Sequence, residues 1–346
     1  MKLLASYPYD LSVVIISFNT RDLLRECLDS LLAECARLPE SMAVEILVVD
    51  NASRDNSAEM VAREFVSASP ESNSRFVVRL ISSNVNLGFG AANNVALEQA
   101  QGRYLVLLNS DAFFHEGALA RAVELMDANP TTGVGGARLV SRDGGWQPSA
   151  RCFHSIWNDA LVITGLSGRF PHSRIFGAPD RTWADPNQAA NVDWVPGAFS
   201  ILRRSALVKA GCFDPAFFLY YEEVDLCRRI KAAGFKISYW PDVVVTHIGG
   251  ESSRQLSSLT FSKSASQVVK WRMRSTLLYY RKHHGSKARM AYWLEQCLYG
   301  IRQLRNRNSS DPTRQQRAEE SALMAGLMRQ AWQETQGGRI SPPRPW

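Results

Sequence analysis

Four short apolar runs in the first 140 residues alternate with amphipathic helical patterns, and this alternation restricts the chain to few folds. The runs are rich in β-branched residues and cover residues 11–18, 44–50, 76–82 and 104–109. Continuous apolar runs of this length are typical of parallel strands that are buried on both faces. Helical spacing follows the runs over residues 20–35, 56–65, 90–100 and 115–128. The pattern predicts βαβ units in a doubly wound, mostly parallel α/β sheet flanked by helices.

The second half of the chain is less regular. Residues 141–190 contain several glycines and prolines and predict a long loop region of the kind that forms lids. We expect order to resume over residues 192–203, in a helix over 222–233 and in a pair of strands around 236–246. Residues 263–307 predict helices that are interrupted near His283, and the chain ends in a Pro-rich tail.

The excess of positive charge is concentrated in one segment. The chain carries +7, whereas residues 263–307 hold eleven basic residues and one acidic residue. Because that segment carries +10, the remaining residues together carry −3, which argues against a uniformly basic nucleic-acid binder. The sequence shows no signal peptide, no apolar run of the roughly 18 residues that span a membrane, and no CxxC pair among six cysteines. We therefore expect a cytoplasmic protein with reduced cysteines.

Polar residues follow three of the predicted strands. The carboxyl ends of strands in an open sheet form the usual ligand-binding edge. Neither GxGxxG after the first strand nor GxxxxGK[ST] occurs, so a Rossmann dehydrogenase and a P-loop NTPase are both unsupported. Asn109 and Asp111 lie two residues apart, on one face of a strand end, and one carboxylate there suits a hard cation that neutralises a diphosphate. The three tails are Ser17-Phe18-Asn19, Asp50-Asn51-Ala52-Ser53 and Asn109-Ser110-Asp111.

Seven sequence blocks occur in a fixed order between about residues 10 and 250. They are SVVIISFNTRDLLRECLDSLL, EILVVDNASRDNS, NVNLGFGAANNVAL, YLVLLNSDA, WVPGAFSILRRSAL, FFLYYEEVDLCRRIKAAGFK and VTHIGG. In these blocks the chain resembles the family 2 inverting glycosyltransferases of GT-A fold, and most of all their rhamnosyltransferase-like branch. The resemblance implies a nucleotide-sugar donor, Mg²⁺ or Mn²⁺ as cofactor, and direct displacement at the anomeric carbon of the donor sugar.

The resemblance also assigns residues to the donor and the metal. Asp50 corresponds to the position that recognises the nucleotide base, and Asp111 and His247 to metal ligands. Asn109 replaces the first aspartate of the family's two-aspartate motif, which lowers the negative charge that faces the metal. The full donor set that we predict is Ser17, Phe18, Asn19, Asp50, Asn51, Ser53, Gly88, Phe89, Asn93, Asn109, Ser110 and Asp111.

The resemblance implies that Glu223 is the general base. A carboxylate that removes the proton of the attacking sugar hydroxyl contributes about 10²- to 10⁴-fold in rate. The family usually has Glu-Asp where this chain has Glu222-Glu223, so the predicted base has one extra methylene. The alternative is that Glu222, Glu223 and Asp225 only complement the dipole of the helix they begin. The acceptor-side residues that we predict are Trp194, Gly197, Ala198 and Glu222.

These assignments predict a GT-A catalytic domain over residues 1–255, with a nucleotide-sugar half over about 10–140 and an acceptor half over about 141–255. A basic helical extension over 256–335 and a flexible tail over 336–346 follow. The reaction expected is transfer of L-rhamnose from dTDP-rhamnose to a glycan or lipid-linked glycan in cell-surface polysaccharide synthesis. A UDP-hexose donor is the alternative.

Three roles remain open for the basic segment, residues 263–307. Its interleaved aromatic residues and cations suit an anionic membrane surface, which would place the enzyme on the inner face of the membrane. It also suits packing on the catalytic domain, or on a second subunit in a homo-oligomer. A nucleic-acid binder is disfavoured, because Asp50, Asp111 and Glu223 would repel a phosphodiester backbone. A nucleotidyltransferase is disfavoured because the first strand ends in FNTRD, without a Gly/Arg/Lys-rich signature.

Overall fold

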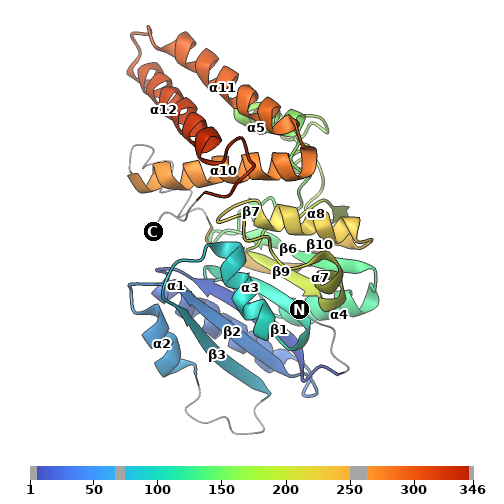
Figure 1. Ribbon diagram of the computed structural model, residues 1–346. Helices are drawn as coiled ribbons and strands as arrows, with labels where there is room; N and C mark the ends of the chain where they lie inside the picture. The colour runs from blue at the N-terminus through green and yellow to red at the C-terminus, as the bar shows by residue number, and fades with distance from the viewer. Residues whose placement is uncertain (1–5, 67–74, 250–262, 343–346) are drawn as a thin grey trace.

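The computed structural model describes residues 6–66, 75–249 and 263–342 (Figure 1). A mixed sheet forms the centre, helices cover both of its faces, and a group of C-terminal helices is stacked above one face. The strands are β1 (Tyr9–Ser17), β2 (Val44–Asn51), β3 (Phe76–Ser83), β4 (Gly102–Asn109), β5 (Ala112–Phe114), β6 (Thr132–Val140), β7 (Trp146–Gln147), β8 (Ala190–Val192), β9 (Phe199–Arg203) and β10 (Lys236–His247).

The helices lie between and after these strands. They are α1 (Arg21–Arg37), α2 (Ser57–Glu64), α3 (Phe89–Gln99), α4 (Ala118–Ala128), α5 (Ile156–Thr164), α6 (Leu166–Arg169), α7 (Arg204–Ala210), α8 (Glu222–Ala232), α10 (Lys263–His284), α11 (Lys287–Asn306) and α12 (Pro312–Glu334).

The order of strands in the sheet is β3-β2-β1-β4-β9-β6-β10-β5. Strands β3, β2, β1 and β4 are parallel to one another, and β9 inserts antiparallel between β4 and β6. Because β1, β2 and β4 are parallel and in register, Ser17 pairs with Asp50, and Ile16 with Asn109. The polar tails predicted to form a ligand edge therefore emerge from adjacent strands.

The two faces of the sheet bury two separate apolar layers. Side chains alternate along β1, so Val13 and Ile15 pack with α1, α2 and α4, whereas Val14 packs with α3, α7, α8 and α10. The helices contribute one apolar stripe each, such as Leu24, Leu28 and Leu31 of α1, which are fully buried. The predicted doubly wound α/β architecture is confirmed.

Two predictions about the second half of the chain are wrong in detail. The pair of strands expected around residues 236–246 is one strand, β10, which continues through an irregularity between Trp240 and Val244. Pro241 lies in this irregularity, where its missing N–H removes no regular ladder bond. The loop expected over residues 141–190 contains the nine-residue helix α5. Ser155 caps the N-terminus of this helix, because its side chain accepts a hydrogen bond from the Asn158 N–H.

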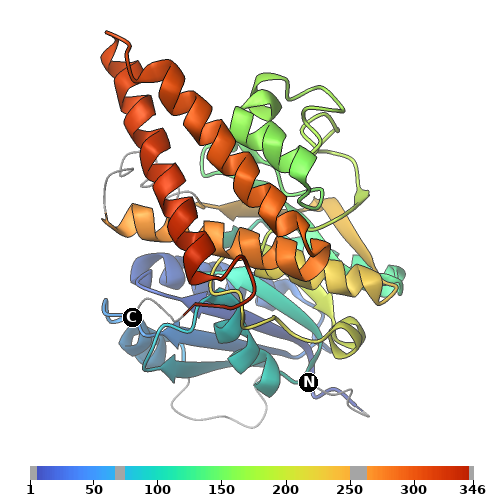
Figure 2. The same ribbon diagram turned by 45° about the horizontal axis from the view of Figure 1, so that its top comes forward.

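The C-terminal extension packs on the domain that contains the sheet, through α10. Leu278, Tyr279 and Tyr280 are buried in the same apolar layer as residues of α3 and α8, and Ser275 Oγ donates to the Leu219 carbonyl at 2.8 Å. Met273 and Leu277 pack instead with α11 and α12. Helices α11 and α12 form an antiparallel pair that projects away from the sheet, with α5 beside α11 (Figure 2). Of the three roles left open for the basic segment, packing on the catalytic domain is therefore the one that α10 fulfils. Within the described ranges, none of the helices is long and apolar enough to cross a membrane.

Candidate functional site

Hydrogen bonds join the loops that follow β1 and β2. The Asn19 N–H donates to Ser53 Oγ at 3.0 Å, and the Arg54 N–H donates to Asn19 Oδ1 at 2.8 Å. Asn19 and Ala52 both have positive φ, 56° and 67°, so each loop turns sharply as it leaves its strand. Two predicted donor residues, Asn19 and Ser53, thus hold each other in place, beside a partly exposed Phe18.

A chain of hydroxyl groups links the ends of β1 and β4. Thr20 Oγ1 lies 3.0 Å from Ser17 Oγ and 2.9 Å from Ser110 Oγ. Ser17 and Ser110 are both buried. These hydrogen bonds fix the position of the Asn109-Ser110-Asp111 tail relative to the β1 loop.

Asp50 has one carboxylate oxygen without a partner. The side chain is 5% exposed, and Oδ2 accepts from the Ser53 N–H at 3.3 Å. Oδ1 is buried and has no hydrogen-bond partner among the described residues. A buried, unpaired acceptor costs free energy unless a ligand supplies the donor. Asp50 therefore fits a group with an N–H or O–H donor.

The loop before α3 closes over this region through Asn51. Asn51 Nδ2 donates to Asn86 Oδ1 at 3.0 Å, and its Oδ1 accepts from the Leu87 N–H at 2.8 Å. Gly88 has φ 79°, and a Cβ there would lie 2.2 Å from the Phe218 carbonyl oxygen. Phe89 N–H donates to that same carbonyl at 2.9 Å, so the loop is held tightly against residues 217–221. Asn93 is buried and donates to the Phe89 carbonyl within α3.

Asp111 and His247 meet at the end of the sheet. His247 Nε2 lies 3.5 Å from Asp111 Oδ1 and 3.5 Å from Asn109 Nδ2. Gln147, on β7, makes two contacts with His247. Its Oε1 lies 3.2 Å from His247 Nδ1, and its Nε2 donates to the His247 carbonyl at 2.8 Å. Gln147 thus orients the imidazole ring with Nε2 toward Asp111. Gln147 was not predicted, because it lies in the region expected to be irregular.

Two adjacent glutamates begin α8. Glu222 is 3% exposed, Glu223 is half-buried, and Oε2 of each is buried without a hydrogen-bond partner in the described structure. Burial and the neighbouring Glu223 raise the pKa of Glu222 well above the ordinary value of a glutamate. Burial also raises the pKa of Glu223, but the charges of Arg151 and His154 oppose this rise. The pair therefore has one carboxyl that tends to keep its proton and one that ionises more readily.

The glutamate pair lies against the start of α3. A Cβ on Gly90, at the start of α3, would lie 3.4 Å from Glu222 Cβ. Tyr221, immediately before the pair, has φ 71° and contacts His154 through its hydroxyl, 3.3 Å from Nδ1. His154 in turn lies 2.7 Å from Asp159. Arg151 and His154 were not predicted, since a single sequence does not show which loop residues turn toward α8.

Of the predicted acceptor residues, Glu222 belongs to the glutamate pair, whereas Trp194, Gly197 and Ala198 lie in the segment before β9. The Trp194 indole is 7% exposed, its Nε1–H donates to the Cys152 carbonyl at 2.9 Å, and Arg151 and His154 lie over the ring. A sugar would reach this ring only if those neighbours moved, and the acceptor role of Trp194 stays a prediction. Gly197 packs against the Phe89 ring, and the Ala198 carbonyl accepts from the Asn109 N–H at 3.0 Å. Gly197 therefore contacts the start of α3, and Ala198 holds the end of β4.

With this geometry in view, comparison with known proteins decides the family. A family model described as glycosyl transferase family 2 matches residues 12–209, more than half of the chain. The chain belongs to glycosyltransferase family 2. The N-acetylglucosaminyl-diphospho-decaprenol L-rhamnosyltransferase of Mycobacterium tuberculosis is 26% identical over 248 residues, which cover 68% of this chain and 75% of that protein. The rhamnosyltransferase WbbL of Escherichia coli is 33% identical over 88 residues, 25% of this chain and 30% of that protein.

Solved structures show the same fold in other glycosyltransferases. A mannosyltransferase from Pyrobaculum calidifontis, solved with GDP-Man and Mn²⁺, has a TM-score of 0.55 at 16% identity, over 94% of this chain and 90% of that one. GalNAc-T7, solved with UDP, GalNAc and Mn²⁺, has a TM-score of 0.53 at 15% identity, over 81% and 50%. The predicted GT-A fold with a C-terminal helical extension is confirmed, and this glycosyltransferase resembles the rhamnosyltransferases of its family.

Proposed function

We propose that this glycosyltransferase transfers L-rhamnose from dTDP-β-L-rhamnose to a glycan or lipid-linked glycan, with inversion at the anomeric carbon, during cell-surface polysaccharide synthesis. One observation carries the proposal: buried carboxylate oxygens of Asp50, at the end of β2, and of Glu222 and Glu223, at the start of α8, lack partners in the described structure. Unpaired buried acceptors are retained where a ligand pairs with them. The L-rhamnosyltransferase relatives support the choice of sugar.

In this proposal Asp50 selects the nucleotide. Its free Oδ1 accepts the N3–H of a pyrimidine base, while Ser53 and Asn51 hold the carboxylate and the covering loop. Both thymine and uracil present this N–H, so Asp50 alone does not separate dTDP from UDP donors. Donors with either base therefore belong in the same test.

The donor set around His247 fits a divalent metal. One carboxylate and one imidazole, with Nδ1 already engaged by Gln147, leave Asp111 Oδ1 and His247 Nε2 facing each other. The described residues gather no group of three His, Cys, Asp or Glu side chains, so a metal here would take its other ligands from the diphosphate and water. When bound, Mg²⁺ or Mn²⁺ would neutralise the charge of the leaving nucleoside diphosphate.

The glutamate pair would perform the proton transfer. Glu222, whose pKa burial raises more, keeps its proton and donates a hydrogen bond toward the acceptor. Glu223, nearer to the charges of Arg151 and His154, is ionised and accepts the proton of the attacking hydroxyl as the new glycosidic bond forms. Two adjacent carboxyls with different environments thus have different roles. Glu222 donates a hydrogen bond to the acceptor, and Glu223 removes the proton of its hydroxyl.

A row of exposed apolar residues on α11 supports contact with a membrane surface, as part of this proposal. Met290, Trp293, Ile301 and Leu304 fall on one side of the helix, and each is more than half exposed. Arginines flank the row, as in helices that lie on anionic bilayers. Peripheral binding there would keep the enzyme close to lipid-linked acceptors.

The experiment that tests the proposed function is donor hydrolysis measured over a panel of dTDP-, UDP- and GDP-sugars, with Mn²⁺ or with a chelator. We expect dTDP-rhamnose to be cleaved fastest, and only with the metal. Faster cleavage of a UDP-hexose would show that the donor is a UDP-hexose and not dTDP-rhamnose. If no nucleotide sugar were cleaved, the proposed transferase activity would be rejected.

A further inference from the structure

A cavity of about 1120 Å³ lies outside the site described above, between α5 and the three helices of the extension. Its wall on one side is formed by residues 163–165 at the end of α5, and on the other by α11 and α12. Arg272, on α10, also lines it. The proposed donor site does not use this cavity.

The cavity is strongly basic. A single acidic residue, Glu320, lines it against five arginines. Arg302 donates to the Ile163 carbonyl at 2.8 Å, whereas the side chains of Arg305 and Arg317 have no hydrogen-bond or ion-pair partner in the described part of the chain. Two unpaired guanidinium groups in one hollow suit a phosphate or diphosphate group. The five arginines are Arg272, Arg302, Arg305, Arg314 and Arg317.

The same cavity also has apolar walls. Ile163, Leu298, Ile301 and Met324 line it beside the arginines. Ile301 is 53% exposed and belongs to the apolar row of α11, which continues to Leu304. An anion without an apolar part would leave this surface in water. The lining therefore matches a molecule that carries both a phosphate group and a hydrocarbon chain.

One residue of the cavity wall lies near the segment that precedes the glutamate pair. Arg272 lies within electrostatic range of Tyr220 and Tyr221, the two residues that precede Glu222. Tyr220 is likewise within range of both glutamates. A ligand held by Arg272 would therefore lie on the side of the cavity toward that segment.

We propose that this cavity binds the phosphate-bearing end of an amphiphilic molecule, with the apolar chain of that molecule along Ile301 and Leu304. The assignment deepens the proposed function and, as an acceptor site, rests on it: the molecule is then the lipid-linked acceptor. The headgroup of a bilayer phospholipid offers the same chemistry, and the experiment separates the two sources.

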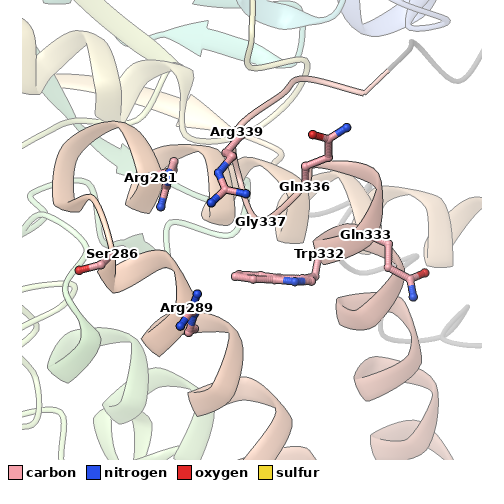
Figure 3. Close-up of a pocket in the computed structure, with 8 residues that line it drawn as sticks. All are labelled: Arg281, Ser286, Arg289, Trp332, Gln333, Gln336, Gly337 and Arg339. Atoms are coloured by element: carbon pink, nitrogen blue, oxygen red, sulfur yellow. The ribbon is translucent and has the colours of Figure 1, made fainter.

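A second, smaller pocket provides a matched control. It has a volume of about 450 Å³, and Figure 3 shows Arg281, Arg289 and Arg339 on the side to which the Trp332 indole points. It offers three arginines but no aliphatic side chain, and its lining does not include Arg272. Removing two charges there changes the net charge of the extension equally without touching the larger cavity.

The test is calorimetric titration of the full chain with farnesyl diphosphate as the probe. We expect Arg305→Gln with Arg317→Gln to weaken binding about tenfold or more, because two charge-assisted contacts are lost. Arg281→Gln with Arg289→Gln should leave the affinity unchanged. Equal weakening in both double variants, or no binding by the wild type, would overturn the proposal.

Two further arms identify the source of the phosphate. Displacement of the probe by phosphatidylglycerol vesicles assigns the cavity to a bilayer headgroup, and retention of the probe assigns it to a lipid-linked diphosphate. Inorganic diphosphate that binds as tightly as the probe would contradict an amphiphilic ligand. No nucleotide sugar enters these titrations, so failure of donor hydrolysis would reject the proposed function separately.

Discussion

The buried carboxylate of Asp225 on α8 accepts a hydrogen bond from Nε2 of His283 on α10, at 2.7 Å. Lys282 lies at the same distance from Oδ1, and Arg229 donates to Oδ2 at 2.8 Å. Asp225 thus ties the C-terminal extension to the helix whose first two residues are the glutamate pair. The extension is a structural part of the site rather than an appendage.

We predict that Asp225→Asn destabilises the protein by about 3 kcal/mol, because Arg229, Lys282 and His283 lose their buried carboxylate partner. Chemical denaturation measures the loss. Asp22→Asn, which removes an exposed ion-paired carboxylate on α1, is the control and should leave the unfolding free energy unchanged. Burial alone would raise the pKa of Asp225, but His283, Arg229 and Lys282 outweigh it and lower the pKa to about 2.

This lowered pKa gives the first prediction a pH dependence. A depressed carboxyl pKa stabilises the folded state above the ordinary aspartate pKa of about 3.9 and ceases to do so as the pH falls toward 2. The stability difference between wild type and Asp225→Asn should therefore shrink over that interval. A difference that stays constant down to pH 2 would contradict the role given to Asp225.

The second prediction separates the two glutamates. Glu223→Gln should lower the transfer rate by about 10²- to 10⁴-fold, since glutamine cannot accept the proton, while donor affinity is retained. Glu222→Gln mimics the protonated form that burial favours and should keep the rate within about tenfold of wild type. Steady-state kinetics and donor titration measure both variants. The reverse order of effects would move the base to Glu222.

The third prediction concerns the pH profile of transfer. Burial raises the pKa of Glu223, so the acid limb of the rate should lie above the ordinary glutamate pKa of about 4.3. The Arg151 charge opposes this rise, so Arg151→Gln should move the limb to still higher pH. Rates measured across pH in both proteins provide the check. If the acid limb of the pH–rate profile stayed in place in Arg151→Gln and only the maximal rate fell, Arg151 would act through packing on Trp194.

The fourth prediction concerns Gly88, in the loop before α3. Gly88→Ala should destabilise the protein by about 2 kcal/mol and weaken donor binding, because its positive φ and the Phe218 carbonyl leave no room for a Cβ. Gly300→Ala on α11 is the matched control, since a Cβ there meets nothing within 4 Å. It should be neutral or stabilising by up to about 1 kcal/mol. Equal thermal shifts in both variants would contradict the close approach at Gly88.

The sequence predicted those parts of the fold and site that depend on local pattern. Buried strands such as residues 44–50 are specified by their own apolar residues, and their ends place Asp50 and Asp111 on one edge without further information. Gln147, Arg151 and His154 could not be found in this way, because their positions depend on how a loop folds back. The contact of Asp225 with His283 joins residues 58 apart and arises only from tertiary packing.

Trp194 and β10 show the same limit. An aromatic residue in the acceptor block suits a sugar platform, but the sequence does not show that neighbouring side chains leave the indole only 7% exposed. Pro241 argues locally for a break in the strand, yet pairing of β10 with β6 on both sides of the irregularity keeps one strand. In both cases neighbours distant in sequence decide the outcome.

The central claim is inverting transfer from dTDP-β-L-rhamnose at a metal-dependent site with Glu223 as base. Proton NMR of donor hydrolysis tests it without an acceptor, at enzyme concentrations high enough for hydrolysis to outpace mutarotation. The account predicts that, with Mn²⁺, α-L-rhamnose is the first anomer released. First release of the β anomer, or no release of dTDP, would contradict it.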